Sequence, residues 1–294
     1  MSVSIHVGAH KTATTHLTNC IDRIERQMIA AGTMFLGPES LRHAPLNLRA
    51  LLNRPDANAE KQASGSAILR GLIDDHRNLV ISEEQILGAI ANGNLTDEAG
   101  RVYPKAGMRL RHLLDLIGTR DVTVFLACRS PADFLTSAFG EYLRHNGPLR
   151  IEDFLGDFDP RALRWSELAE RLMQESGAAR MICWRYEDLA AIRPELLRSL
   201  LGPDLAAIVP DLPPTRLGLS DAAYRALLAQ SEGDTATREM TGKVLRAMPK
   251  QGQADRLRAL PQALHDECDR LYAADCARIA AMPAVRFLSP PVQG

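Results

Sequence analysis

A short run near the amino terminus, GAHKTATT at residues 8–15, combines one lysine with several threonines. It lies between an apolar segment of strand length and a segment whose apolar residues have helical spacing. The free N–H groups and the dipole of a helix N-terminus bind anions, and Lys11 adds a full positive charge. The hydroxyl donors available there belong to Thr12, Thr14 and Thr15. The run therefore predicts a loop that binds a phosphate or sulfate group.

The same residues disfavour a standard ATP or GTP loop. The Walker A pattern GxxxxGK[ST] needs a glycine directly before the lysine, and His10 stands at that position. A solvated lysine beside a threonine-rich helix cap is the alternative interpretation of this loop.

A second candidate anion site begins at Arg129, which follows an apolar segment and precedes a helical pattern that contains Ser137. Ligands of parallel α/β sheets bind beyond the carboxyl ends of the strands, so Arg129 and the first loop should share one edge. If the segment after Pro131 is helical, Ser137 lies about two turns further along. A guanidinium near a hydroxyl suits a terminal phosphate, although an arginine at a strand end is as often part of a structural ion pair.

A sheet must position these residues, and apolar runs of strand length alternate with helical patterns along the chain. This alternation is typical of βαβ units and a parallel sheet. The five expected strands are residues 3–7, 33–36, 79–81, 122–127 and 181–184. Helices with apolar stripes are expected at residues 17–28, closed by Gly32, at residues 110–117, and at residues 165–172, closed by Gly177.

The chain changes after residue 202, where proline-rich turns are followed by helical segments that begin at Ser220, a predicted N-cap. We expect residues 1–202 to form an α/β core and residues 203–294 to form a mainly helical part packed on the same domain. Residues 53–65 contain several small polar residues and are predicted to form a mobile loop.

The composition is that of a globular protein, with 294 residues, 46% of them hydrophobic and 24% charged. Lys and Arg number 35 against 36 Asp and Glu, which argues against a protein that binds nucleic acid. We find no signal-peptide pattern and no apolar stretch of roughly 20 residues, so we expect a cytoplasmic protein without stable membrane insertion. The five cysteines show no CxxC motif and no Cys/His ligand pair, so we interpret them as reduced core residues and expect no metal site.

Together the two motifs resemble those of the sulfotransferases that use PAPS (3′-phosphoadenylyl sulfate) as donor, in particular their bacterial branch. Residues 8–15 are similar to the family's 5′-phosphosulfate loop, written GxHKTGTT, and residues 129–139 are similar to its 3′-phosphate motif, RxPxxRxxSxY. The resemblance implies that PAPS, or its product PAP, binds to Gly8, Lys11, Thr12, Ala13, Thr14, Thr15, Arg129 and Ser137, with no metal required.

Further short motifs follow in the order that the resemblance implies, over roughly the first 220 residues. Residues 81–84 (ISEE) are similar to the family's SxE, residues 184–189 (WRYEDL) to its RYEDL segment, and residues 217–220 to its distal LS stretch. We interpret Glu187 and Asp188 as structural carboxylates.

The chain also departs from the family pattern. Ala13 replaces a glycine, Phe134 stands where the 3′-phosphate motif often has a second arginine, and Phe139 replaces a tyrosine. The 3′-phosphate should therefore be held by fewer groups. Four later cations could serve it or an anionic acceptor, although a solvated helix face is the other interpretation: Arg238, Lys243, Arg246 and Lys250.

A transferase of this kind needs a base within hydrogen-bond reach of the acceptor. Glu84 matches the SxE glutamate by the resemblance, Glu39 follows the second expected strand, and His10 lies in the phosphosulfate loop. Of the neighbours Glu83 and Glu84, one at most should face the ligand if the chain is extended there. We expect Glu84 to be the base, with Glu39 and then His10 as the alternatives.

The sequence thus predicts a soluble α/β protein with a P-loop-like, five-stranded parallel sheet flanked by helices and a mainly helical C-terminal part. The resemblance implies sulfuryl transfer from PAPS to a hydroxyl or amine of a small-molecule, carbohydrate or lipid acceptor, with Lys11 stabilising the leaving oxygen. A non-catalytic nucleotide- or glycan-binding protein on the same scaffold and, less favoured, a P-loop kinase are the alternatives.

Overall fold

Six parallel strands form one sheet in a computed structural model that describes residues 2–53, 58–90, 95–97, 99–213, 218–231, 238–252 and 254–291. The strand order is β2-β3-β1-β4-β5-β6. The strands are β1 (Ser2–His6), β2 (Thr33–Leu36), β3 (Asn78–Ser82), β4 (Val122–Cys128), β5 (Arg180–Arg185) and β6 (Val285–Leu288). All five strands predicted from the sequence are confirmed within one or two residues.

The prediction of five strands was wrong by one, because β6 extends the sheet at its edge beside β5. It has only four residues, one of which is the exposed Arg286. So short and partly charged a segment gives no apolar run, and only the pairing of β6 with β5 identifies it as a strand.

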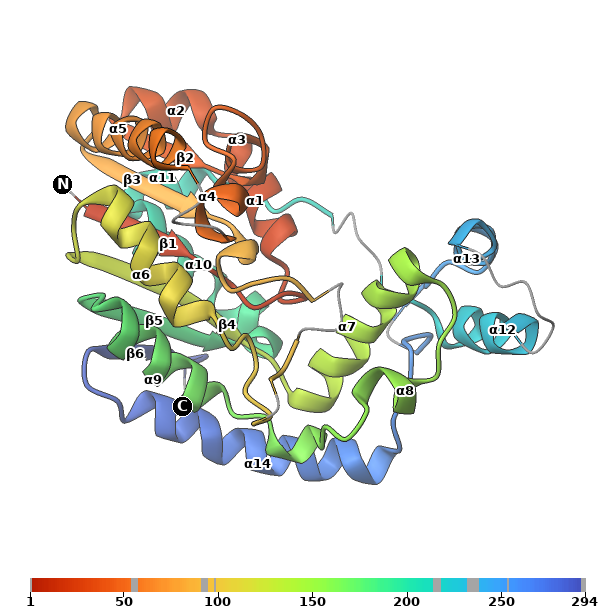
Figure 1. The fold of residues 1–294 in the computed structure, drawn as a ribbon. Helices are drawn as coiled ribbons and strands as arrows, with labels where there is room; N and C mark the ends of the chain where they lie inside the picture. Colours follow the sequence, from red (N-terminus) through yellow and green to blue (C-terminus); the bar gives the residue numbers. More distant parts are fainter. Residues whose placement is uncertain are drawn as a thin grey trace.

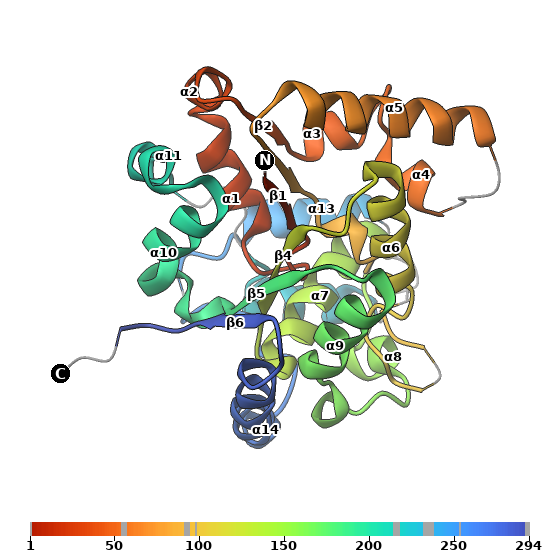
Figure 2. The same ribbon diagram turned by 90° about the vertical axis from the view of Figure 1, so that its left-hand side faces the viewer.

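Helices cover both faces of the sheet, as Figure 2 shows. One face carries α1 (Thr14–Asp22), α2 (Glu25–Ala30), α10 (Leu189–Leu201) and α11 (Pro203–Ile208). The other carries α5 (Ala59–Asp75), α6 (Ala106–Ile117), α9 (Trp165–Ser176) and α14 (Gln262–Ala280). Side chains alternate along a strand, so Val80 packs on the first face while Leu79 and Ile81 pack on the second.

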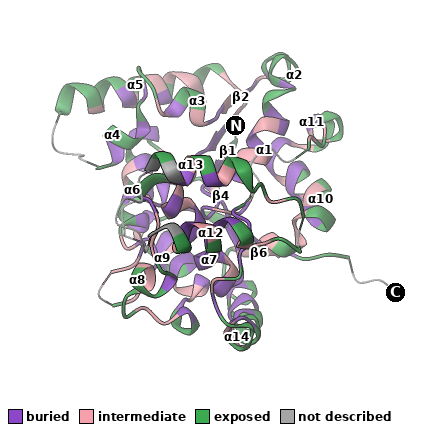
Figure 3. Ribbon diagram, turned by 90° about the vertical axis from the view of Figure 1, so that its right-hand side faces the viewer, coloured by how far each residue is buried: buried purple, intermediate pink, exposed green. Residues whose placement is uncertain are grey.

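Beyond the carboxyl ends of the strands lies a third group of helices, seen on the right of Figure 1. It contains α7 (Pro131–Asn146), α8 (Ile151–Leu155), α12 (Asp221–Ser231) and α13 (Arg238–Ala247), which share an apolar cluster around Phe139 and Leu227. Figure 3 views this end of the molecule and shows α12 and α13 with exposed outer faces. Of the C-terminal part, α12 and α13 therefore stand over the edge where the candidate ligand loops lie, whereas α11 and α14 cover the faces of the sheet.

Five short helices among the described residues follow strands or link other helices. They are α3 (Pro38–Leu41), α4 (Leu48–Asn53), and the 3-10 helices η1 (Glu84–Ile86), η2 (Pro160–Ala162) and η3 (Tyr186–Asp188).

Two local expectations were wrong. The helix expected over residues 17–28 is divided into α1 and α2 at Ile24, whose φ of −113° leaves the helical range, although its apolar stripe is buried throughout. The mobile loop expected at 53–65 is helical from Ala59, where Asn58 caps α5 by accepting from the Lys61 N–H at 2.9 Å. Gly65 is buried there against Leu51, so its small size serves helix packing; residues 54–57 lie outside the described residues.

Several other expectations are confirmed. Ser220 caps α12, since its Oγ accepts from the Ala223 N–H at 3.1 Å, and Gly177 ends α9 with a φ of 73°. All five cysteines are buried and unpaired with one another. Among the described helices, none has the length and apolarity needed to cross a membrane.

Candidate functional site

The loop between β1 and α1 follows a tight path that brings its backbone inward. Gly8, Lys11 and Ala13 all have positive φ, at 35°, 66° and 66°. A Cβ on Gly8 would lie only 2.5 Å from Thr14 Oγ1, so this position accepts glycine alone without rearrangement. Ala13 is held in the left-handed region, which explains why a glycine suits that position in the pattern of the resemblance.

The N-terminus of α1 is available for a ligand. Its N-cap is Ala13, whose methyl group cannot accept a hydrogen bond from the first-turn N–H groups. Thr14 Oγ1 is buried and has no hydrogen-bond partner among the described residues, and Thr15 is half-buried. Thr12 differs, because its hydroxyl donates to the Ala9 carbonyl at 2.5 Å and so shapes the loop. An anion at this helix end would satisfy the first-turn N–H groups and the Thr14 hydroxyl together.

The two predicted anion motifs are in direct contact. Arg129 Nη1 donates to the Lys11 carbonyl at 2.7 Å, and its guanidinium carbon lies 4.7 Å from the centre of the Tyr186 ring. Its Nε is buried and has no partner among the described residues. Glu187 accepts from the Ser130 N–H at 2.8 Å and from the Tyr272 hydroxyl at 3.2 Å, which supports the interpretation of Glu187 as structural.

Further cations gather near Arg129. Burial and the charges of Arg129 and Arg256 lower the pKa of Lys250, so Lys250 lies close enough to both arginines to interact with them electrostatically. The Arg256 guanidinium lies 3.5 Å from Asp133 on the first turn of α7. Ser137 is half-buried and comes one turn after Asp133 on the same helix face. The structure thus brings Ser137, Arg129 and Lys250 to one region.

His265 also faces Asp133. Its Nδ1 is 3.3 Å from Asp133 Oδ1, and the residue is only 7% exposed. The hydrogen bond with His265 is the main cause that lowers the pKa of Asp133.

Lys11 and Glu141 form an ion pair across the site, with 3.0 Å between Nζ and Oε2. Burial would raise the pKa of Glu141, but Lys11, His145 and Arg144 together lower it to about 2. Glu141 lies one turn after Ser137 on α7. The sequence analysis missed it, although its spacing of four from Ser137 was a usable signal.

His10 is buried and bound to Tyr103. The Tyr103 hydroxyl accepts from the His10 backbone N–H at 3.1 Å and forms a second hydrogen bond with His10 Nδ1 at 2.9 Å. Burial, with the charges of Lys11 and Arg42, lowers the pKa of His10 to about 3. His10 is therefore neutral near pH 7.

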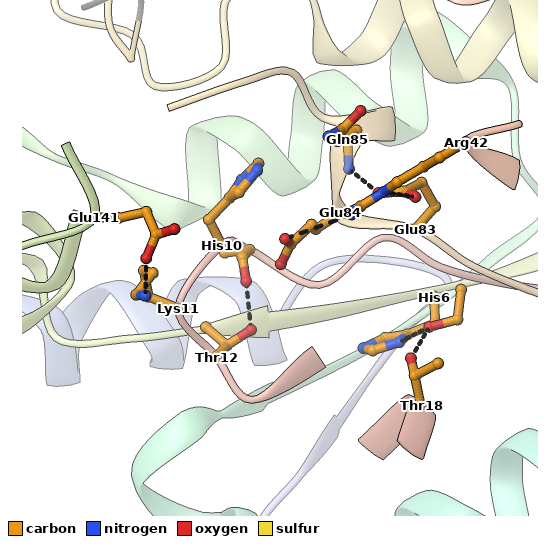
Figure 4. A network of polar contacts seen from close by, with 12 residues as sticks. His6, His10, Lys11, Thr12, Thr18, Arg42, Glu83, Glu84, Gln85 and Glu141 are labelled. Atoms are coloured by element: carbon orange, nitrogen blue, oxygen red, sulfur yellow. Dashed lines mark hydrogen bonds and ion pairs between the residues drawn. The ribbon is translucent and has the colours of Figure 1, made fainter. Parts of the chain in front are cut away.

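The adjacent glutamates have different surroundings. Glu83 is 2% exposed and binds Arg42 through two contacts of 2.8 Å, and it also accepts from the Gln85 N–H at 2.9 Å. Glu84 is half-buried, with Oε1 3.8 Å from Arg42 Nη2. In Figure 4 the Lys11–Glu141 pair lies on one side of His10, and Glu84, Arg42 and Glu83 lie on the other. Of the two glutamates, only Glu83 thus forms a bidentate ion pair with Arg42.

Glu39 lies apart from this group. It is exposed on α3, and its charge is among the causes that raise the pKa of Asp22 at the C-terminal end of α1. The structure therefore brings together Gly8–Thr15, Arg129, Ser137 and Glu84, while it leaves Glu39 beside the far end of α1.

A cavity of about 810 Å³ opens next to the glutamates. Gln85, which follows Glu84, and Tyr103, which binds His10, both line it. No sequence motif pointed to this cavity, because its walls come from four separate segments.

One group of potential metal ligands exists among the described residues. His16 Nε2 lies 3.7 Å from Cys20 Sγ and 3.4 Å from Asp211, a pairing of Cys and His that the sequence analysis did not recognise. Arg193 Nε lies 3.5 Å from the same Asp211 carboxylate, so a positive charge already partners the carboxylate.

The sequence matches no protein-family model, and no curated protein is similar to it. Among solved structures, a sulfotransferase from Alicyclobacillus acidocaldarius is similar over 96% of this chain and 95% of that chain, with 14% identity and a TM-score of 0.45.

Proposed function

We propose that this protein is a sulfotransferase that moves a sulfuryl group from PAPS to a hydroxyl or amine of a small-molecule, carbohydrate or lipid acceptor. The observation that carries the proposal is the contact between the two anion motifs. Arg129 and Lys11, which are 118 positions apart in sequence, meet through a 2.7 Å hydrogen bond at the carboxyl edge of the sheet. PAPS carries anionic groups at both its 5′ and 3′ positions, so it requires two such sites side by side.

Buried polar atoms that have no hydrogen-bond partner in the described part of the chain fit such a donor. Thr14 Oγ1 and the N-terminus of α1 suit the 5′-phosphosulfate, with Thr15, Gly8 and Ala13 completing that loop. In this proposal the 3′-phosphate is bound by Arg129, Ser137 and Lys250. Lys250 compensates for the apolar Phe134, which stands where the resemblance leads one to expect a second arginine.

The reaction breaks the bond between sulfur and the bridging oxygen of the phosphosulfate as the acceptor oxygen or nitrogen bonds to sulfur. The electron pair of the broken bond stays on the 5′-phosphate of PAP, and the acceptor proton passes to a base. Lys11 is placed to stabilise the charge that grows on the leaving oxygen, which is a preorganised electrostatic role. No metal is needed for these steps.

Glu84 is our assignment for the base. Glu83 is committed to Arg42 and the Gln85 N–H, Glu39 is exposed on α3, and His10 is buried with its Nδ1 bound to the Tyr103 hydroxyl. Half-buried Glu84 remains beside the cavity, and its charge acts on Tyr103, the partner of His10.

Calorimetry with PAP, AMP and ATP tests the donor site. PAP should bind about 10-fold or more tightly than AMP or ATP, because a charge-assisted contact to the 3′-phosphate contributes roughly 1.5–3 kcal/mol. Lys250→Gln should weaken PAP and leave AMP unchanged, whereas the control Lys243→Gln, an exposed lysine paired with Glu239, should change neither. ATP binding as tight as PAP binding would instead favour the kinase alternative.

Transfer of ³⁵S from PAPS to a panel of hydroxyl and amine compounds tests the reaction itself. A labelled product that requires Lys11 supports the enzyme. Tight PAP binding without a product from any acceptor would favour the non-catalytic binding protein.

A further inference from the structure

Where the structure describes its walls, the cavity beside Glu84 carries more basic side chains than carboxylates. Among the described residues, its walls carry four basic side chains and one carboxylate: Arg49, Arg101, Lys105, Arg109 and Asp97. Asp97 is already bound to Arg101 at 2.7 Å. In the described part of the chain, no carboxylate lies within ion-pair distance of Arg49, Lys105 or Arg109.

Arg109 shows the imbalance most clearly. It is 6% exposed, and its guanidinium donates to the carbonyls of Gln85 at 2.7 Å and Ile86 at 2.9 Å, and to the Asn53 side chain. All three acceptors are neutral. Burial and the nearby charge of Arg49 lower the pKa of Arg109 to about 10, so it remains charged near pH 7. Buried charges in proteins are normally paired, and here the pairing partner is lacking among the described residues.

The cavity is also large enough and mixed enough in character for an organic molecule. Its volume of about 810 Å³ lies within the range of small-molecule sites, and Leu87, Ala89 and Pro104 supply apolar wall. Exposed Arg49 and Lys105 stand where a ligand would meet them from solvent. Positive clefts of this kind raise the local concentration of anions.

We propose that this cavity binds an organic anion and, resting on the sulfotransferase function proposed above, that the acceptor carries a carboxylate, phosphate or sulfate group besides the group that is sulfated. Arg109 and Arg49 recognise the anionic group. The side of the cavity at Gln85 and Tyr103 adjoins Glu84 and His10, so an acceptor held there reaches the base.

A matched pair of fluorescent probes tests the anion preference without any need for turnover. 8-Anilinonaphthalene-1-sulfonate and N-phenyl-1-naphthylamine differ only by the sulfonate, and both brighten in apolar sites. Titrations with the PAP-saturated protein should show the sulfonate probe bound about 10-fold more tightly, the size expected of a charge-assisted contact. Saturation with PAP keeps the probe out of the donor site.

Three variants locate the binding. Arg49→Ala and Lys105→Ala, both at exposed positions, should each weaken the sulfonate probe about two- to fivefold and leave the neutral probe unchanged. Arg111→Ala is the control, because Arg111 lies on α6, the helix that carries Arg109, and is exposed outside the cavity. Equal affinity for the two probes, or equal effects of Arg49→Ala and Arg111→Ala, would overturn the proposal.

The two proposals fail in distinguishable ways. If PAP binds normally but the sulfonate probe is not preferred, the proposal of an anionic acceptor is overturned and the proposed sulfotransferase function stands. If the protein binds no PAP but still prefers the sulfonate probe in a way that depends on Arg49, the cavity binds anions but no donor site exists. That result would overturn both the sulfotransferase function and the assignment of the anion as an acceptor.

Discussion

Lys11 and Glu141 form an ion pair across the candidate donor site, with Nζ and Oε2 3.0 Å apart. One residue comes from the loop after β1 and the other from α7, so the pair joins the sheet edge to the helices above it. The pKa of Glu141 is lowered to about 2, so its negative charge persists throughout the neutral range. A donor whose phosphosulfate must meet Lys11 therefore binds in competition with Glu141.

Glu141→Gln should strengthen PAP binding, because it removes a negative charge that repels the nucleotide and occupies Lys11. We expect about a three- to tenfold decrease in Kd by calorimetry, from roughly 1 kcal/mol of ion-pair energy. Glu152→Gln, which removes an exposed charge from α8, should leave Kd unchanged. Weaker PAP binding in Glu141→Gln would mean that Glu141 positions Lys11 for the donor.

Lys11→Ala should lower turnover far more than PAP affinity. A lysine that meets the leaving oxygen interacts most strongly in the transition state, and loss of such a group typically costs about 100-fold or more in kcat. The ³⁵S transfer rate measures this effect, with exposed Lys61→Ala as the control. Unchanged kcat with a raised KM for the donor would limit Lys11 to a binding role.

Glu84→Gln should reduce turnover by about 100- to 10,000-fold, the usual contribution of a general base, while PAP affinity stays nearly the same. Glu39→Gln should be fully active, because Glu39 is exposed beside Asp22. An active Glu84→Gln together with an inactive Glu39→Gln or His10→Asn would show that the base is misassigned.

The stability of the protein should fall steeply as pH falls below neutral. Burial lowers the pKa of His6 to about 4, and burial with Lys11 and Arg42 lowers that of His10 to about 3. In the unfolded chain these histidines take up protons near pH 6.5, whereas in the folded protein they stay neutral. Each histidine should therefore lower the free energy of unfolding by about 2 kcal/mol between about pH 7.5 and about pH 5. Urea unfolding at these pH values measures the loss. Over the same pH range, the free energy of unfolding of His6→Gln should fall by about half as much as that of the wild type. Each fall is measured from the protein's own value at the upper pH.

Gly8→Ala should destabilise the fold and abolish PAP binding. The added Cβ meets Thr14 Oγ1 at 2.5 Å in a backbone with φ of 35°, and overpacking of this kind costs about 1–3 kcal/mol. Gly71→Ala is the matched control, since a Cβ there meets no atom within 4 Å and should stabilise α5 by about 0.5–1 kcal/mol. Thermal unfolding and calorimetry together report both effects, and wild-type behaviour of Gly8→Ala would contradict the tight loop.

The sequence by itself determined most of the sheet and the main parts of the candidate donor site. Apolar strands buried on both faces give continuous runs such as Val122–Cys128, and loops at their carboxyl ends must share one edge, so Arg129 could be expected near residues 8–15. The tertiary structure alone decided which charges meet there. Glu141, Lys250, Arg42 and Arg109 lie on segments far apart in the chain, and the periodicity of a segment carries no information on its distant partners. The same limit applies to β6, which is a strand because β5 offers an open edge. It applies also to Glu83 and Glu84, because the two 2.8 Å hydrogen bonds from Arg42 to Glu83, against its 3.8 Å distance to Glu84, distinguish a structural carboxylate from a candidate base.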